Sequence, residues 1–208
     1  MIRTLYLHGF ASSPQSFKAQ ELARRFAARG WPFEAPDLNG PEFRLLTLTG
    51  QLAAIERQAA GEPVHLIGSS LGGYLAALYA ARHGEVRKLV LLAPAFGFAR
   101  LYERSLGAGR VEAWRRGGFL RLMHYGRGEE TELGWQFLED ARRYEEEPAF
   151  TQPCLIFHGV SDDVVPVQVS RRFARTRTCC TLYEVDSGHE LKDQVEGIWE
   201  TASEFLRP

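Results

Sequence analysis

The residues from Val64 to Gly84 place a strand, an abrupt turn and a helix in direct succession. Val64 to Ile67 form a short apolar run, which is typical of a buried strand. The next residues read Gly-Ser-Ser-Leu-Gly-Gly from Gly68 to Gly73. Apolar residues then recur at helical spacing: Leu71, Tyr74, Leu75, Leu78 and Tyr79. A strand that enters a helix with almost no connecting loop favours an α/β architecture.

The rest of the chain repeats this alternation of short apolar runs and helix-period segments. Alternation of this kind predicts strands joined by crossover helices into a parallel sheet. The expected strands span residues 2–7, 33–36, 64–67, 86–93, 154–158 and 181–185. We therefore predict an α/β fold, with a mainly parallel sheet of about six strands and helices on both faces. A single domain over residues 1–208 is the expected organisation.

Residues 96–150 break this rhythm, and we interpret them as an inserted lid. Gly117-Gly118 is compatible with a tight hairpin turn or with a junction between two short helices. Leu133, Phe137, Ala141 and Tyr144 have the spacing of one helical face. Seven arginines and two glutamates occupy residues 99–128, whereas eight acidic residues and two arginines occupy 129–147. The two halves are expected to pair with each other.

The composition excludes several classes of partner. The 208 residues carry a formal charge of -1, so no basic field favours nucleic acid. No apolar run approaches the roughly 20 residues that cross a bilayer, and the first residues are too polar for a signal peptide. We expect a cytoplasmic protein. Three cysteines without paired spacing, at 154, 179 and 180, indicate reduced structural thiols and no metal site.

Gly68-Ser69-Ser70-Leu71-Gly72 is a G-x-S-x-G sequence between a predicted strand and a predicted helix. This is the context of a nucleophile elbow, in which a sharp turn exposes the central serine above the carboxyl ends of the strands. Ser70 is therefore the candidate nucleophile, and close backbone approach requires glycine at both 68 and 72. Ser69 is expected to support the backbone.

A serine nucleophile needs a base, and the base needs an orienting acid. His189 follows the last predicted strand, and Asp162 follows the fifth. The chain order Ser70, Asp162, His189 is that expected of a catalytic triad on such a sheet. Asp163 remains an alternative acid or a helix cap. His158 is interpreted as structural, and His124 as a surface residue that could reach the site.

Attack on a carbonyl creates an oxyanion that fixed donors must stabilise. The amide of Leu71, at the positive N-terminus of the elbow helix, is one candidate donor. The second is expected from the loop after the first strand, His8-Gly9-Phe10-Ala11, with the amide of Phe10 preferred. Gly9 would allow close approach, although His8-Gly9 also fits a plain strand-ending turn.

These segments together resemble the α/β-hydrolase superfamily over nearly the whole chain, and its small bacterial serine esterases in particular. The resemblance rests on Tyr6-Leu7-His8-Gly9-Phe10, the elbow, His158 to Pro166, and Ser187-Gly188-His189. It implies a Ser-Asp-His hydrolase that needs no cofactor or metal. With about six expected strands, the chain departs from the family's larger members as a minimal version of that fold. The insertion corresponds to the superfamily's variable lid, so the substrate does not carry over.

Serine at the elbow favours acyl transfer, and we expect hydrolysis of a carboxylic ester with a small or medium acyl group. Thioester or amide hydrolysis would use the same residues, and a non-catalytic ligand-binding protein on this fold is the alternative of another class. Five lid residues are candidates either for an acyl pocket or for packing of the lid onto the body: Trp114, Phe119, Leu120, Leu122 and Met123.

Overall fold

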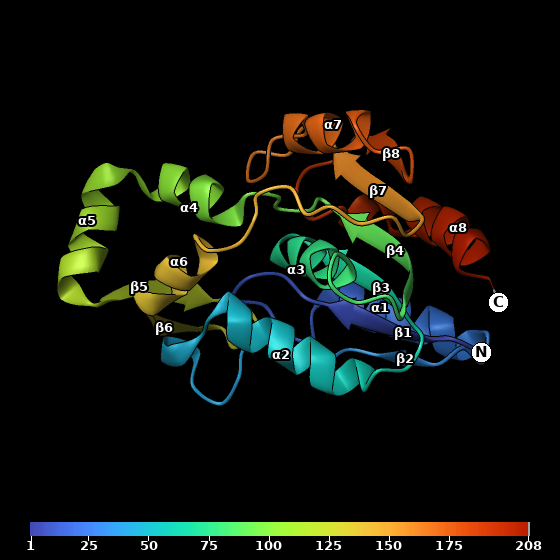
Figure 1. Ribbon diagram of the computed structural model, residues 1–208, viewed down its shortest axis with the longest axis horizontal. Helices are drawn as coiled ribbons and strands as arrows, with labels where there is room; N and C mark the ends of the chain where they lie inside the picture. The colour runs from blue at the N-terminus through green and yellow to red at the C-terminus, as the bar shows by residue number, and fades with distance from the viewer. Residues whose placement is uncertain (208) are drawn as a thin grey trace.

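A six-stranded parallel sheet forms the centre of the protein (Figure 1). The computed structural model describes residues 1–207. The strand order is β2-β1-β3-β4-β7-β8, and every neighbouring pair is parallel. The strands are β1 (Arg3–Leu7), β2 (Phe33–Glu34), β3 (Val64–Ser69), β4 (Val86–Leu92), β7 (Cys154–Gly159) and β8 (Cys180–Val185). The predicted fold class is confirmed.

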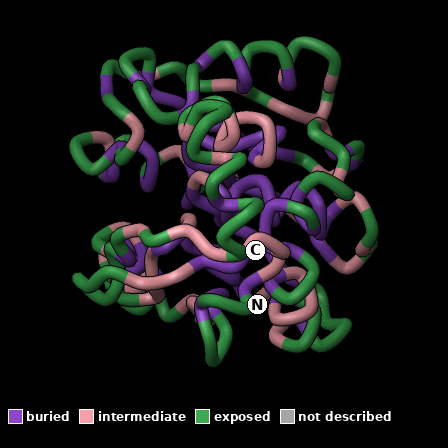
Figure 2. Tube along the Cα trace, turned by 90° about the vertical axis from the view of Figure 1, so that its left-hand side faces the viewer, coloured by how far each residue is buried: buried purple, intermediate pink, exposed green. Residues whose placement is uncertain are grey.

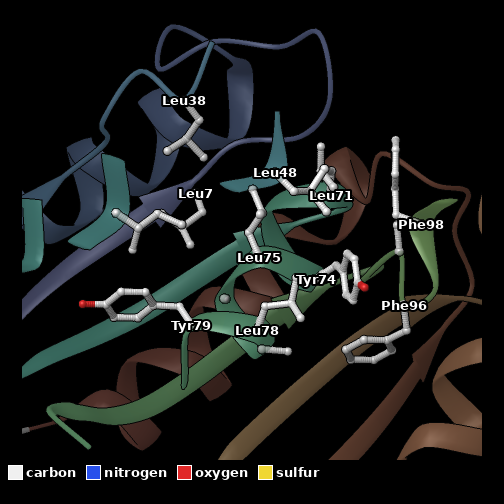
Figure 3. Close-up of a cluster of buried hydrophobic side chains, with 14 of the residues drawn as sticks. Leu7, Leu38, Leu48, Leu71, Tyr74, Leu75, Leu78, Tyr79, Phe96 and Phe98 are labelled. Atoms are coloured by element: carbon white, nitrogen blue, oxygen red, sulfur yellow. The ribbon is translucent and has the colours of Figure 1, made fainter. Parts of the chain in front are cut away.

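Helices cover both faces of this sheet. One face packs against α1 (Phe17–Ala28) and α8 (Val195–Leu206) through a cluster that includes Phe26, Ile198 and Trp199. The other packs against α2 (Leu48–Ala59), α3 (Leu71–Ala80) and α7 (Gln168–Arg175). Figure 3 shows the second cluster, where side chains of α3 lie among those of neighbouring elements. Buried positions gather in the interior of the molecule, and exposed ones lie at its periphery (Figure 2).

The central strand β3 explains why the sheet takes this form. All six of its residues are buried, and successive side chains point to opposite faces. Leu66 joins the cluster under α2 and α3, whereas Ile67 joins the cluster under α1 and α8. A strand that is apolar on both faces is stable only when both faces are covered, which is the situation of parallel sheets.

The insertion lies beyond the ends toward which the strand arrows point (Figure 1). It consists of α4 (Phe98–Leu106), α5 (Ala108–Gly117), the antiparallel pair β5 (Phe119–His124) and β6 (Glu129–Gly134), and α6 (Gln136–Ala141). Gly117-Gly118 forms neither of the predicted junctions, because it joins a helix to a strand. The hairpin turn lies instead at residues 125–128.

Two other expectations for the insertion need correction. Leu133 belongs to β6, so the proposed helical face begins only with Phe137. The charged halves pair only in part. Arg100 in the basic half forms an ion pair with Glu146 in the acidic half at 2.8 Å. Other acidic residues bond to residues outside the insertion. Glu147 pairs with Arg172 at 2.5 Å, and Asp140 accepts hydrogen bonds from the amide and the hydroxyl of Thr49. The acidic half therefore also ties the insertion to the rest of the protein.

Two short 3₁₀ helices, Phe43–Leu45 and Lys192–Gln194, complete the described elements. Among all the helices of residues 1–207, none combines the length and the apolar character that a bilayer crossing requires.

Candidate active site

Ser70 occupies a strained turn between β3 and α3. Its backbone angles are φ 56° and ψ -119°, a region that residues with a side chain rarely adopt. A Cβ at Gly68 would collide with the backbone of Gly72, and a Cβ at Gly72 would collide with the carbonyl of Leu7. Both positions thus require glycine, as the sequence indicated. The reason at position 72 is the neighbouring strand β1, not contact across the turn.

The structure brings Ser70, His189 and Asp162 together. The Oγ atom of Ser70 lies 3.0 Å from Nε2 of His189, and Nδ1 of His189 lies 2.7 Å from Oδ2 of Asp162. A carboxylate only accepts, so Nδ1 carries the hydrogen and Nε2 is free to accept from the serine hydroxyl. Asp163 is exposed, whereas the side chain of Asp162 is fully buried.

The carboxylate of Asp162 is held by several donors. Its Oδ1 accepts from the amides of Val164 at 2.9 Å and Val165 at 2.8 Å, while Nε2 of His158 lies 3.2 Å from Oδ2. Burial by itself would raise the pKa of this carboxyl. The contacts with His158, His189 and the Val165 amide outweigh burial and hold the pKa of Asp162 well below its usual range. The group is therefore ionised at neutral pH.

The loop that carries His189 is anchored by residues on both sides of it. Leu191 is buried in the core and adopts a left-handed conformation, with φ 53°. The ammonium of Lys18, on α1, donates to the carbonyl of Glu190 at 2.6 Å. Burial lowers the pKa of Lys18 to about 8. Sequence reasoning missed Lys18, because a lysine in a helix ordinarily indicates a solvated face.

The two amides predicted to be oxyanion donors belong to Phe10, in the loop after β1, and to Leu71, at the start of α3. A Cβ on Gly9 would touch the Cβ of Ser70 at 3.4 Å, so the loop after β1 runs directly beside the elbow. Within residues 1–207 neither amide donates to a protein acceptor. The ring of Phe10 is held by aromatic neighbours at 5.2 to 5.9 Å between centroids, namely Phe43, Phe98, Tyr102 and Phe137.

His8 fixes the orientation of this loop. The amide of Leu38 donates to its Nε2 at 3.0 Å, so Nδ1 carries the hydrogen and donates to the carbonyl of Gly9 at 2.9 Å. That carbonyl belongs to the same rigid peptide unit as the amide of Phe10. Holding one end of the unit therefore sets the direction of the other. The sequence pointed to the loop but not to this contact.

Backbone strain gathers at the same edge of the sheet. Four of the five non-glycine residues with positive φ within residues 1–207 lie in segments that follow four different strands: Ala11, Ser70, Ala93 and Leu191. Each such residue costs on the order of 1–3 kcal/mol and persists only where its surroundings enforce it. Strain of this kind is typical of functional sites.

The lid residues divide by their surroundings. Trp114 is buried within the insertion, where its Nε1 donates to the carbonyl of Leu133 at 2.9 Å, while Met123 is 43% exposed. His124, which the sequence indicated as a surface residue of the insertion, is buried, so that expectation is wrong. Its ring is buried against Phe43, with 4.8 Å between centroids, and burial lowers its pKa. The strand pattern alone could not reveal this, because the cover comes from a distant segment.

This arrangement of sheet, elbow and rim loops is the α/β-hydrolase fold, and solved structures of that fold superpose on it. A putative hydrolase from Agrobacterium vitis is 24% identical, with a TM-score of 0.84 over 99% of this chain and 88% of that one. Mouse alpha/beta hydrolase domain-containing protein 10 is 20% identical, with a TM-score of 0.81 over 98% and 88%. Est1E from Butyrivibrio proteoclasticus, with ferulic acid bound, is 21% identical, with a TM-score of 0.75 over 98% and 89%.

The chain belongs to the uncharacterised protein family UPF0227, whose sequence pattern matches residues 3–206. A comparison with curated proteins finds no match. The solved structures share its fold at low identity, so the chemistry has to be argued from its own residues.

Proposed function

We propose that the protein is a serine hydrolase that cleaves a carboxylic ester of a small or medium acyl group through an acyl-serine intermediate. The observation that carries this proposal is the unbroken pair of hydrogen bonds from Ser70 through His189 to Asp162, at 3.0 and 2.7 Å. Such a chain on a strained elbow provides a nucleophile, a base and an ionised acid in contact.

In the first half-reaction, the Ser70 hydroxyl passes its proton to Nε2 of His189 as Oγ attacks the ester carbonyl carbon. The carbonyl oxygen becomes an oxyanion, which the amides of Phe10 and Leu71 stabilise. Asp162 stays ionised and stabilises the imidazolium. His189 then donates its proton to the leaving alkoxide oxygen, which departs as an alcohol and leaves an acyl-serine.

Water completes the cycle by the reverse order of proton transfers. His189 takes a proton from water as the water oxygen attacks the acyl carbon, and it returns that proton to Ser70 Oγ when the acid leaves. The chain supplies every proton acceptor and donor that these steps require.

The test is turnover of acetyl and butyryl p-nitrophenyl esters by the wild-type protein and by Ser70→Ala. We expect the substitution to reduce kcat by at least about 10³-fold. A fluorophosphonate probe should label Ser70, with Ser69→Ala as the matched control that still reacts. Labelling that survives Ser70→Ala contradicts the assignment.

Thioester and amide substrates of graded chain length form the second arm of the experiment, because the same residues could act on another leaving group. Faster Ser70-dependent turnover of either class would replace ester hydrolysis as the activity. Ligand binding without Ser70-dependent turnover of any of them would favour a non-catalytic protein.

A further inference from the structure

His158 is a buried histidine that the proposed mechanism does not use. It lies in β7, four residues before Asp162, and is 0% exposed. Its Nδ1 is 2.7 Å from the hydroxyl of Ser170 on α7, and its Nε2 is 2.8 Å from the carbonyl of Val165. The same Nε2 is 3.2 Å from Oδ2 of Asp162.

These partners determine where the ring hydrogen sits. The Val165 carbonyl and the Asp162 carboxylate only accept, so Nε2 must carry a hydrogen. The hydroxyl of Ser170 can then donate to Nδ1, and a neutral ring satisfies every partner. The Nε2 hydrogen is directed mainly at the carbonyl, and Oδ2 receives the weaker share of it.

The contacts restrain Asp162 from two directions. The amide of Val165 donates to Oδ1 of Asp162, and the carbonyl of Val165 accepts from His158. The turn from 162 to 165 is thus stabilised by two hydrogen bonds to Val165, one with the Asp162 carboxylate and one with the His158 imidazole. Oδ2, the atom that faces His189, also has the His158 hydrogen beside it. Rotation of the carboxylate would break contacts at both oxygens.

We propose that His158 is a positioning residue, which holds the Asp162 carboxylate in the orientation that the base His189 needs. This inference rests on the proposed function. His158, which the sequence indicated as a structural residue of a strand, then acts on catalysis through Asp162 and never touches substrate.

Three other charged or titratable groups lie near Asp162 and His158. Lys18 on α1 interacts with Asp162 through its charge, but its ammonium is bonded to the Glu190 carbonyl. Glu184 on β8 faces His158 and is neutralised by Arg171, which bonds it at 2.5 Å. The imidazole of His189 is the remaining titratable group on the carboxylate.

Two substitutions at the same position separate the contacts. A glutamine at position 158 can place its amide nitrogen where Nε2 of His158 lies, and can still donate to the Val165 carbonyl and Asp162 Oδ2. The shorter asparagine places its amide nitrogen only where Nδ1 lies, so it loses both acceptors. We expect His158→Asn to lower kcat about tenfold with KM within about twofold of wild type, because the loss is one of orientation. His158→Gln should stay within about threefold.

His65→Asn is the matched control. His65 is also a buried histidine of the central sheet, but it lies near the start of β3, at the opposite end from the site, and its Nδ1 has no partner within residues 1–207. The His65→Asn variant should keep the kcat of the wild type. His158→Asn should also move the acid limb of the pH profile to lower pH, because a carboxylate that is no longer held toward His189 stabilises the protonated base less. A structural defect alone would leave the limb in place.

A readout without substrate keeps this inference separate from the proposed function. The hydrogen between His189 Nδ1 and Asp162 should give a far-downfield proton resonance, present in the wild type and in His158→Gln and absent or broadened in His158→Asn. If the protein turns over no ester, thioester or amide, the proposed function is wrong. The comparison of the resonance in the wild type and the two variants still tests the positioning role of His158. Equal kcat, acid limb and resonance in both variants and the wild type would overturn it. If His158→Asn does not fold, loss of the resonance in folded His158→Gln overturns it and retention supports it.

Discussion

Replacing Ser70 with glycine should stabilise the protein relative to replacing it with alanine. Both substitutions remove the hydroxyl and its 3.0 Å contact with His189, so this loss cancels between them. They differ in the Cβ, which the backbone at φ 56° and ψ -119° tolerates poorly. The comparison therefore measures the strain stored at the elbow.

The size of the effect follows from two opposing contributions. A residue with a side chain in such a conformation costs about 1–3 kcal/mol. Glycine loses about 0.5–1 kcal/mol more than alanine through the entropy of the unfolded chain. The expected net gain is about 1 kcal/mol, which for a domain of this length raises Tm by about 2–4 °C.

Thermal unfolding of the two purified variants side by side tests this estimate, with urea unfolding as the second measure. Both variants should be inactive toward esters, so activity does not distinguish them. A glycine variant that melts at or below the alanine variant would show that the elbow stores no strain, and the argument from its backbone would be wrong.

Three further predictions concern single positions. Gly72→Ala should prevent folding or lower the free energy of unfolding by several kcal/mol, because its Cβ would collide with the carbonyl of Leu7. Gly84→Ala should be tolerated, because no other atom lies within 4 Å of the added Cβ. Soluble yield and Tm of the two variants test this difference. Asp162→Asn should cost about 3 kcal/mol at pH 7. Since the folded pKa of Asp162 is lowered, its stabilisation is present above the unfolded pKa of about 3.9 and is lost as pH falls below it, so urea unfolding should show the variants converging in acid. Trp114→Phe should lower stability by about 1 kcal/mol through its lost hydrogen bond, with kcat for acetyl esters unchanged; a fall in kcat would mean that the lid orients the site.

The inner strands of the sheet, such as β3 and β7, could be predicted because they are buried on both faces. Runs such as Val64 to Ile67 have no competing interpretation once helix-period segments flank them. The same is true of the elbow, where glycine spacing and the strand-to-helix transition coincide. Chain order then indicated which later loops to search for a base and an acid.

The insertion could not be predicted in the same way. Leu133 fits a helical spacing with Phe137, yet it pairs with Leu120 in an antiparallel hairpin. Short amphipathic segments satisfy both periodicities, and only the partner strand decides between them. His124 is buried for a similar reason, since Phe43 covers it from about eighty residues away in sequence.

The residues that orient the proposed site could not be recognised in the sequence, because each acts through the backbone carbonyl of another residue. His8 holds the Gly9 carbonyl, Lys18 holds the Glu190 carbonyl, and His158 holds the Val165 carbonyl. A side chain that bonds a carbonyl leaves no motif, since every residue has one. Spacing therefore pointed to the proposed reacting groups but not to the residues that hold them in place.

These three contacts share a physical purpose. Each lies beside a different part of the proposed site: the loop with the Phe10 amide, the base His189 and the acid Asp162. The proton transfers tolerate only small errors in position, and a strained edge would relax if its loops were free. The three hydrogen bonds to backbone carbonyls hold these loops in place. Weakening any one of them should therefore change kcat before it changes KM, since the geometry of reaction depends on these contacts more than the surface that receives the substrate does.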